Sequence, residues 1–351
     1  MSTAEDDRRT AATHPDERLM ARVRSALDRW GGHPAAVAPT SSILGTGAIA
    51  AVEAAMSAHH NDIPAILLPS ASYALGIALS AIGVGAGDEV LLPALDWPAS
   101  FAAVANLGAQ AIPIAVDPAT LTIDPNACAA VVTPRTAAII ASHLHGVCAD
   151  IPAIRAAAPH LPVIEDCAAA LGSSIDGLRT GTMGDLAVIS FGPGKRIDAG
   201  EGGVLLVRDP QHHRRALSAC VHPLRATLLG LEADHRSTIM RPHPLTAMLA
   251  LDALAQWDPR ADEKAHRDTA RELSEGPAVE LVGHDSRRTN AGPTIPILAT
   301  GKQLALHGKT NAVVLPGSNN ETMLHDLADR LRLLPTTGKP NSGEESGCRV
   351  G

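Results

Sequence analysis

Four short segments of the sequence combine reactive side chains with residues that can position them. Glu165-Asp166 ends an apolar run with carboxylates, and Phe191-Gly-Pro-Gly-Lys195 places an amine in a glycine-flanked loop after another apolar run. Ser70-Ala71-Ser72 offers two hydroxyls at the start of a helical stretch, and Asp96-Trp97 offers an indole. An amine, a carboxylate, a helix N-terminus and an aromatic face can together hold and activate a phosphorylated aromatic aldehyde.

This set of groups matches the requirements of pyridoxal 5′-phosphate (PLP) chemistry. A lysine in a mobile loop forms a Schiff base when its amine loses a proton, and a carboxylate keeps the ring nitrogen protonated so that the ring withdraws electrons. Free N–H groups at a helix N-terminus bind phosphate, and an aromatic side chain stacks on the ring. Taken singly, Lys195 is typical of a solvated turn, Asp166 of a helix cap and Trp97 of a core residue. The prediction therefore depends on their order and spacing together.

Strand and helix signals alternate along the part of the chain that carries these segments. Short apolar runs predict strands at 65–68, 89–92, 111–116, 137–142, 163–165, 186–190 and 203–207, with helices at 46–58, 73–82, 99–107 and 151–158. This alternation is typical of a mostly parallel sheet covered on both faces, an α/β fold. Ligands of such sheets bind beyond the carboxyl ends of the strands. The residues that directly follow each strand are therefore the first candidates for a site.

The sequence predicts four regions. Residues 1–30 form an N-terminal arm that is partly disordered and carries a helix from about residue 17 to 30. Residues 31–257 form the large PLP-binding domain. Residues 258–334 form a small C-terminal α+β domain, entered through a charged helix at 258–273, with strands at 293–297 and 312–315 and a helix at 321–333. The Gly-, Pro- and Ser-rich tail at 335–351 is predicted to be disordered.

Composition excludes several other classes of protein. The net charge of −8 and the lack of a basic block argue against nucleic acid as a partner. The five cysteines are odd in number and lack C-x-x-C spacing, which favours reduced thiols over disulfides or a zinc site: Cys128, Cys148, Cys167, Cys220 and Cys348. The polar N-terminus has no signal-peptide core, and no run of about 18 apolar residues predicts a membrane span. We expect a cytoplasmic protein without a bound metal.

Two nucleotide-binding motifs are matched only superficially. Gly45-Thr-Gly47-Ala-Ile-Ala50 fits the dinucleotide pattern, but no clear strand precedes it and nothing acidic lies between Asp62 and Asp88. A helix start is the simpler interpretation. Gly192-Pro-Gly-Lys195 suggests a Walker A lysine, but the residue that follows Lys195 is an arginine instead of Ser or Thr.

Several motifs occur in an order that resembles the DegT/DnrJ/StrS family, the sugar aminotransferases among the fold type I PLP-dependent enzymes. The resemblance covers roughly residues 41–258. The segments that carry it are Gly85-Ala-Gly87-Asp88-Glu89-Val90, Ser142-His-Leu-His-Gly146, Val163-Ile-Glu-Asp166-Cys-Ala-Ala, Gly181-Thr-Met-Gly184-Asp185, Ser190-Phe-Gly-Pro-Gly-Lys195 and Gly200-Glu-Gly-Gly203.

The resemblance implies a role for each matching position. Lys195 resembles the catalytic Schiff-base lysine, and Asp166 resembles the partner of the ring nitrogen. Trp97 falls where an aromatic residue stacks on the ring. Ser190 falls at a contact to the phosphate or the ring edge, and Ala71 and Ser72 stand where a Gly-Thr pair binds phosphate. The family also implies a homodimer with its active site at the subunit interface.

The sequence departs from the family at several positions. Ala169, still predicted to contact the cofactor, stands where Gln or His is usual, and Leu171 replaces a common His. Ile239 stands near the position of a partner-subunit Asn, although Arg241 fits the Arg of that segment. Asp96 replaces a usual Thr and adds negative charge. The short C-terminal domain suggests a specialised member of secondary metabolism.

Other polar residues near these motifs favour structural roles. His143 and His145 could contact substrate or cofactor, but a histidine at a strand end is more often structural. Glu201 is expected to shape the loop after Lys195, and Cys167 to be a small packing residue.

Three functions are compatible with these residues and their resemblance. The first is a PLP-dependent aminotransferase that transfers an amino group from a donor to a ketone or aldehyde of a polar, sugar-like or secondary-metabolite acceptor. The second is a PLP-dependent enzyme of the same fold that catalyses elimination, cyclisation or carbon–carbon bond formation. The third is a binding or regulatory module, which the retention of both Lys195 and Asp166 disfavours.

Overall fold

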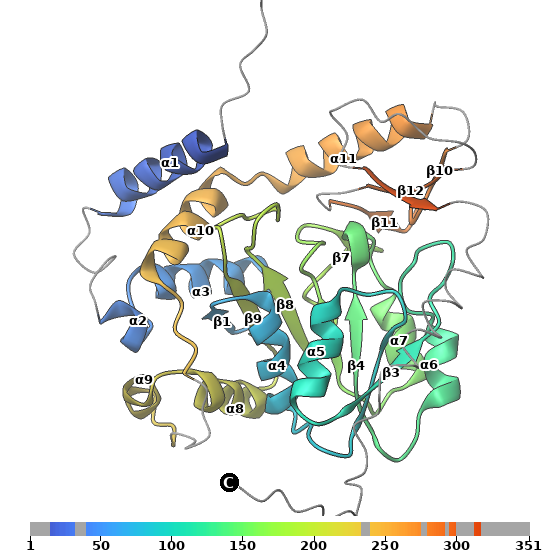
Figure 1. Cartoon of the computed structure of the whole chain (residues 1–351), viewed down its shortest axis with the longest axis horizontal. Coiled ribbons are helices and arrows are strands. Elements are labelled where there is room, and N and C mark those ends of the chain that lie inside the picture. Colours follow the sequence, from blue (N-terminus) through green and yellow to red (C-terminus); the bar gives the residue numbers. More distant parts are fainter. Residues whose placement is uncertain are drawn as a thin grey trace, which may run out of the picture.

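A seven-stranded sheet forms the centre of the computed structural model (Figure 1), which describes residues 15–31, 40–232, 239–274, 279–291, 295–299 and 312–316. Its strand order is β1-β9-β8-β5-β4-β2-β3. Only β9 runs antiparallel to its neighbours. The mostly parallel α/β sheet predicted from the sequence is therefore confirmed. The strands are β1 Ala65–Leu68, β2 Glu89–Pro93, β3 Gln110–Ile114, β4 Thr136–Ser142, β5 Val163–Asp166, β8 Leu186–Ser190 and β9 Gly203–Val207.

Helices cover both faces of this sheet because successive residues of each strand point to opposite sides. Alternate side chains of β5 illustrate this: Ile164 packs with the helices of one face, and Val163 packs with those of the other. One face carries α4 Ala71–Ala81, α5 Pro98–Asn106 and α8 Pro210–Cys220. The opposite face carries α3 Ala48–His59 and α10 Pro244–Gln256 at one end, with α6 Pro125–Val131 and α7 Ile151–Ala157 at the other. The short helix α9 spans Pro223–Leu228.

The N-terminal helices pack on the α3/α10 end of the molecule. Helix α1 spans Pro15–Ala26, continues as η1 Leu27–Gly31, and buries Ala26 in the same apolar cluster as α10. Within the described residues, the segment Ser41–His59 is long and apolar enough to cross a membrane by length and composition. It is divided into α2 Ser41–Leu44 and α3, and the fully buried Ile49, Val52 and Met56 face the protein core. These contacts are those of a core helix.

The C-terminal part begins with helix α11 Pro259–Ser274 and continues into short strands. The three-stranded sheet β10-β12-β13 consists of Val279–Leu281, Ile295–Ala299 and Ala312–Pro316. Its last two strands agree with the strands predicted at 293–297 and 312–315. Strand β11 Arg288–Thr289 instead joins β6 Ser174–Ile175 and β7 Leu178–Arg179. The helix predicted at 321–333, the tail at 335–351 and residues 1–14 lie outside the described residues.

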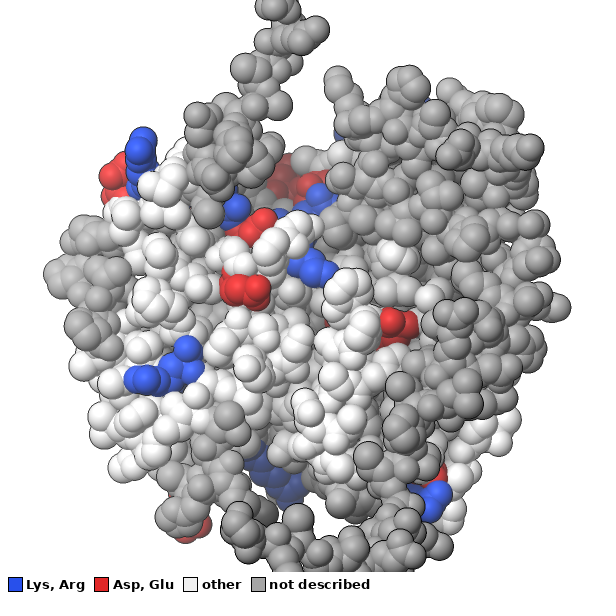
Figure 2. Space-filling model, viewed as in Figure 1, with Lys and Arg blue, Asp and Glu red and all other residues white. Residues whose placement is uncertain are grey.

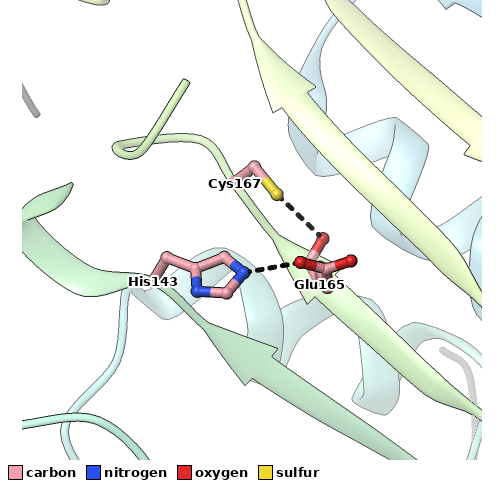
Figure 3. A group of neighbouring side chains, drawn as sticks. All are labelled: His143, Glu165 and Cys167. Carbon is pink, nitrogen blue, oxygen red and sulfur yellow. Dashed lines mark hydrogen bonds and ion pairs between the residues drawn. The ribbon is translucent and has the colours of Figure 1, made fainter. Parts of the chain in front are cut away.

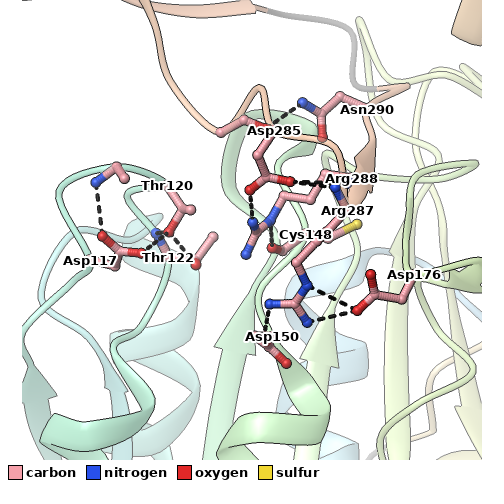
Figure 4. Close-up of polar contacts among 12 residues, drawn as sticks. Asp117, Thr120, Thr122, Cys148, Asp150, Asp176, Asp285, Arg287, Arg288 and Asn290 are labelled. Carbon is pink, nitrogen blue, oxygen red and sulfur yellow. Dashed lines mark hydrogen bonds and ion pairs between the residues drawn. The ribbon is translucent and has the colours of Figure 1, made fainter.

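Two arginines attach this C-terminal part to the large sheet domain (Figure 4). Arg287 binds Asp150 and Asp176, each at 2.7 Å. Arg288 Nε donates a hydrogen bond of 2.9 Å to the carbonyl oxygen of Cys148, and its guanidinium pairs with Asp285. Because Cys148 and Asp150 lie on the segment after β4, these contacts hold residues 285–288 beside the carboxyl edge of the sheet.

Helix α4 begins in direct contact with the first residue of β9. A Cβ atom built on Gly203 would lie 2.6 Å from the carbonyl carbon of Ser70 and 2.7 Å from Ala71 Cα. Such distances are below any normal contact, so only glycine allows this approach. Gly203 thereby fixes the position of the N-terminus of α4 at the sheet edge.

We predict that Gly203→Ala lowers the free energy of unfolding by about 1–3 kcal/mol, because the added methyl group pushes α4 away from β9. Gly76→Ala is the matched control within α4, since a Cβ there meets nothing within 4 Å. That control should leave stability unchanged or raise it by up to about 1 kcal/mol. Chemical denaturation measures both variants, and equal stabilities of Gly203→Ala and wild type would refute the steric argument.

Candidate active site

The carboxyl ends of β1, β2, β4, β5 and β8 meet at one edge of the sheet, where a pocket of about 330 Å³ opens. This volume suits a small cofactor or substrate. The pocket is lined by every residue that the sequence predicts to contact the cofactor: Ala71, Ser72, Trp97, Asp166, Ala169, Ser190 and Lys195. Segments separated by more than a hundred residues in sequence therefore converge on one site.

Asp166 ends β5 and directs a largely buried carboxylate to the pocket. Its exposure is 8%, and Oδ1 accepts a hydrogen bond of 2.9 Å from the N–H of Ala168. Among the described residues no donor reaches Oδ2. Burial raises the pKa of this carboxyl group, while the N–H of Ala168 and the charge of Lys195 oppose the rise. An acceptor oxygen at the pocket wall that receives no hydrogen bond from the described residues suits a ligand with an N–H group.

Lys195 lies on the loop that follows β8, the strand adjacent to β5. Burial lowers the pKa of its amine, and the charge of Asp166 counteracts this effect. A lowered pKa increases the fraction of unprotonated amine, which is the nucleophilic form. Asp166, at the end of β5, and Lys195, on the loop after the adjacent β8, thus influence each other electrostatically.

The lysine loop is held on both sides of Lys195. Asp198 accepts hydrogen bonds from the N–H groups of Gly194 at 3.1 Å and Gly200 at 2.9 Å. Arg196 binds the carbonyl oxygen of Ala291 and, at 3.0 Å, the carboxylate of Asp262 on α11. The loop is therefore fixed within the large domain and also tied to the C-terminal part.

The N-terminus of α4 forms part of the pocket wall. Ser70 caps the helix by accepting the N–H of Tyr73 at 3.3 Å, while Ala71 and Ser72 line the pocket wall. Partial positive charge at a helix N-terminus attracts anions. Ser190 lines the pocket from the end of β8, and its hydroxyl accepts the N–H of Gly192 at 3.2 Å. This end of the pocket fits a phosphate group.

Trp97 covers the mouth of the pocket from the start of α5. Its side chain is 71% exposed, although it lines the pocket. This exposure differs from that of a core residue, the simpler interpretation of a lone tryptophan. An indole held at the pocket rim offers a flat surface on which a ring can stack.

Ser142 is a pocket residue that was not predicted from the sequence. It ends β4, lies opposite Asp166 in the β4–β5 register, and donates a 2.7 Å hydrogen bond to Asp96 Oδ2. The strand-end rule that selected Asp166 and Ser190 applies equally to this serine and could have found it.

Glu165 and His143 form a buried pair beside the pocket, whose wall includes His143 (Figure 3). The Glu165 carboxylate accepts hydrogen bonds from the N–H groups of Gly181, Met183 and Gly184 at 2.6–2.9 Å, and from His143 Nε2 at 2.9 Å. His143 Nδ1 accepts the N–H of Ala149 at 2.9 Å, so the ring proton resides on Nε2. Burial favours the neutral acid, but these hydrogen bonds outweigh it and hold the pKa of Glu165 below its ordinary value.

Cys167 lies close enough to this pair for the three side chains to resemble a metal site. However, both oxygens of Glu165 and both ring nitrogens of His143 already have hydrogen-bond partners. Burial also raises the pKa of the Cys167 thiol, which disfavours the thiolate that a metal requires. We assign the group as a structural support of β4 and β5.

A family sequence profile matches residues 36–297 of the chain and describes the DegT/DnrJ/EryC1/StrS aminotransferases. The chain belongs to this family. The family resemblance predicted from the sequence is thus confirmed, and with it the cofactor class, since these aminotransferases depend on PLP. The free Oδ2 of Asp166, the amine of Lys195 and the helix N-terminus at Ala71 fit this cofactor in charge and hydrogen bonding.

Individual members of the family show similarity over different lengths. L-Glutamine:2-deoxy-scyllo-inosose aminotransferase of Micromonospora echinospora is 41% identical over 165 residues, 46% of this chain and 39% of that protein. EryC1 of Saccharopolyspora erythraea is 33% identical over 243 residues, 66% of this chain and 64% of that protein. The chain therefore spans less than two thirds of the length of these curated relatives. The crystal structure of 3-amino-5-hydroxybenzoic acid synthase superposes with a TM-score of 0.63 at 28% identity, over 80% of this chain and 72% of that one.

The family departures occupy different environments in the structure. Ala169 lines the pocket with a methyl group, so it offers no side-chain hydrogen bond to a ligand. Leu171 is buried in the core beside α3 and α10 and does not line the pocket. Ile239 is 48% exposed and also lies away from the pocket. Of these three positions, only Ala169 alters the pocket wall directly.

We predict that Glu165→Gln lowers the free energy of unfolding by about 3 kcal/mol or more at neutral pH, because an amide N–H₂ cannot accept the hydrogen bonds that the carboxylate accepts. The folded-state pKa of Glu165 is lowered, so its stabilisation is present above the pKa of the unfolded state and is lost as pH falls through the folded-state pKa. The difference in the free energy of unfolding between Glu165→Gln and wild type should therefore become smaller at acidic pH.

Glu232→Gln serves as the control, because Glu232 is exposed. Urea denaturation at several pH values measures all three proteins. A Glu165→Gln variant as stable as Glu232→Gln at neutral pH would show that the buried carboxylate is not a structural anion.

Proposed function

We propose that the protein is a PLP-dependent aminotransferase of secondary metabolism, with Lys195 as its catalytic residue. The observation that carries this proposal is the position of Lys195 and Asp166 on one pocket, at and beyond the ends of adjacent strands, where no described residue donates a hydrogen bond to Asp166 Oδ2. When bound, PLP supplies an aldehyde that condenses with amines and a ring that withdraws electrons from the bond to be broken.

The residues of the chain divide the remaining tasks among them. Asp166 holds the proton on the ring nitrogen. The N-terminus of α4 and the hydroxyls of Ser72 and Ser190 bind the phosphate, and Trp97 stacks on the ring. Lys195 provides the amine that carries the cofactor. With PLP bound, Lys195 Nζ would lie at the pocket wall as the group that moves a proton to and from the substrate.

The substrate class is inferred from the relatives and from the pocket. Relatives named for L-glutamine and 2-deoxy-scyllo-inosose support L-glutamine as the amino donor and a polyhydroxylated ketone as the acceptor. The relative named 3-amino-5-hydroxybenzoate synthase supports a secondary-metabolite setting. The polar groups around the pocket, Asp96, Ser142 and His145, are suited to hydroxyl-bearing substrates.

We also infer a homodimer in the cytoplasm. Tyr73 is 53% exposed on α4 and Trp97 is 71% exposed at the pocket mouth, an apolar surface that a second subunit would cover. The four cysteines of the described part are free and buried, as is usual for a reducing compartment. On the face drawn in Figure 2, the described Lys and Arg side chains form separate spots among acidic ones, which gives nucleic acid no continuous basic surface.

The test is a half-reaction of the PLP-loaded protein with L-glutamine in the absence of an acceptor. We predict formation of one equivalent of 2-oxo acid per active site, measured by mass spectrometry. Lys195→Ala should slow this step by roughly two to four orders of magnitude, the usual contribution of a positioned acid–base group. Lys264→Ala is the control, because Lys264 is exposed on α11 and its ion pair among the described residues is with Asp268, away from the pocket.

Elimination or cyclisation products without stoichiometric 2-oxo acid would favour the second function predicted from the sequence, a non-transaminating enzyme of the same fold. Equal rates for Lys195→Ala and Lys264→Ala would contradict the role of Lys195.

A further inference from the structure

Asp96 provides the pocket with a second carboxyl group. It lies three residues beyond the end of β2, and both of its oxygens accept hydrogen bonds. Oδ2 accepts the Ser142 hydroxyl at 2.7 Å, and Oδ1 accepts the N–H of Trp97 at 2.7 Å. These contacts fix the carboxyl group of the half-buried Asp96 at the pocket wall.

Ser142 places this second carboxyl group near Asp166. It ends β4 opposite Asp166 in the β4–β5 register, so the hydroxyl that binds Asp96 comes from the residue beside Asp166. Both carboxyl groups line the same pocket. Burial, and next the negative charge of Asp166, raise the pKa of Asp96 to about 7, while the hydrogen bond from Ser142 opposes the rise.

Within the described part of the chain, Asp166 is the one titratable group on the pocket wall that shifts the pKa of Asp96. From the loop after β8 comes Lys195, whose charge acts on Asp166 and on His145. From the segment after β4 come His145, whose pKa is lowered by burial and then by Lys195, and His143, whose ring is turned to Glu165.

The start of α5 faces Asp96 with uncharged groups in the described part of the chain. The N–H of Trp97 donates to the carboxylate and lowers its pKa, and the nearby Ser100 hydroxyl, which makes no hydrogen bond among the described residues, acts in the same direction. Their effect is smaller than that of burial and of Asp166, so the pKa of Asp96 stays well above its ordinary value.

On the basis of the PLP site proposed above, we propose that Asp96 is a positioning residue that acts through Asp166. When Asp96 is protonated, the end of the pocket at Asp166, where the ring nitrogen would bind, carries one negative charge. When Asp96 is ionised, that end carries two. When Asp96 is neutral, its O–H donates to Ser142, whose hydroxyl can reverse direction. When Asp96 is ionised, the Ser142 hydroxyl donates to it, as in the structure.

The second negative charge has a defined consequence for a ring bound at Asp166. A nearby anion favours the protonated form of a nitrogen, so ionised Asp96 raises the pKa of the ring nitrogen and of the nitrogen that Lys195 contributes. As pH rises past neutrality, Asp96 becomes ionised and, together with Asp166, keeps the ring nitrogen protonated. Because Asp96 stands where the family usually has threonine, the strength with which the cofactor ring withdraws electrons would depend on pH.

The first test uses the full chain without PLP and compares proton release by wild type and Asp96→Asn in potentiometric titrations. The difference curve should show one proton with its midpoint near pH 7. Ser142→Ala, compared with Ser142→Ala/Asp96→Asn, should move this midpoint to higher pH, because the hydroxyl no longer stabilises the charged form. A midpoint near 4, the ordinary value of an aspartate, would overturn the proposal; so would an unchanged midpoint in the Ser142 variants.

The second test follows the visible absorption of the PLP-loaded protein with pH. Asp96→Asn, and independently Asp96→Thr, should lower the midpoint of the spectral transition by about one pH unit, since one negative charge is lost near the ring. Glu201→Gln is the control that removes an exposed carboxylate of the loop after Lys195, and it should match wild type. Equal midpoints in wild type and both Asp96 variants would overturn the proposal. A wild-type protein without any lysine-bound cofactor spectrum would instead contradict the proposed function.

Discussion

The pairing of β5 with β8 is the constraint on which the site depends. In this parallel pair Asp166 lies opposite Val188, two residues before the strand end at Ser190, and the lysine loop begins directly afterwards. Because parallel strands leave the sheet in the same direction, the carboxylate and the amine emerge side by side without any direct contact in sequence. A shift of one residue in this register would turn Asp166 toward a helix layer and separate the two groups.

Much of the polar structure around the pocket maintains this register. The buried Glu165 precedes Asp166 and accepts the N–H groups of Gly181, Met183 and Gly184 in the turn that leads into β8, so one carboxylate connects the end of β5 to the start of β8. His143 extends the same network to β4. Gly203 brings α4 against β9, and Arg196 connects the lysine loop with α11. The reactive groups are thus held by contacts that lie outside the pocket itself.

The sequence is most informative where a strand is short, apolar and buried. The bounds of β1, β8 and β9 agree with the predicted 65–68, 186–190 and 203–207 because such runs have sharp ends at polar or glycine residues. The helices α6, α8 and α10 were not predicted. Each starts with Pro after a capping Asp or His, and this pair of residues in the sequence could have indicated the helix start.

Other features depend on contacts between distant residues and could not be predicted. Strands β6, β7 and β11 have two residues each, too few for a periodic pattern, and β11 pairs with β6 across more than a hundred residues. The hydrogen bond from Ser142 to Asp96 likewise exists only because β2 and β4 are neighbours in the sheet. The sequence showed the added charge of Asp96 but not this contact.

The central claim is that the amine of Lys195 and the carboxylate of Asp166 serve one cofactor ring, and the lysine can be located directly. The chain has five lysines, Lys195, Lys264, Lys302, Lys309 and Lys339. Borohydride reduction of the PLP-loaded protein makes the lysine linkage permanent, and peptide mass spectrometry then identifies the modified residue. We expect the label on the peptide that contains Lys195 and its loss in Lys195→Ala. A label on other lysines, or one that persists in that variant, would contradict the claim.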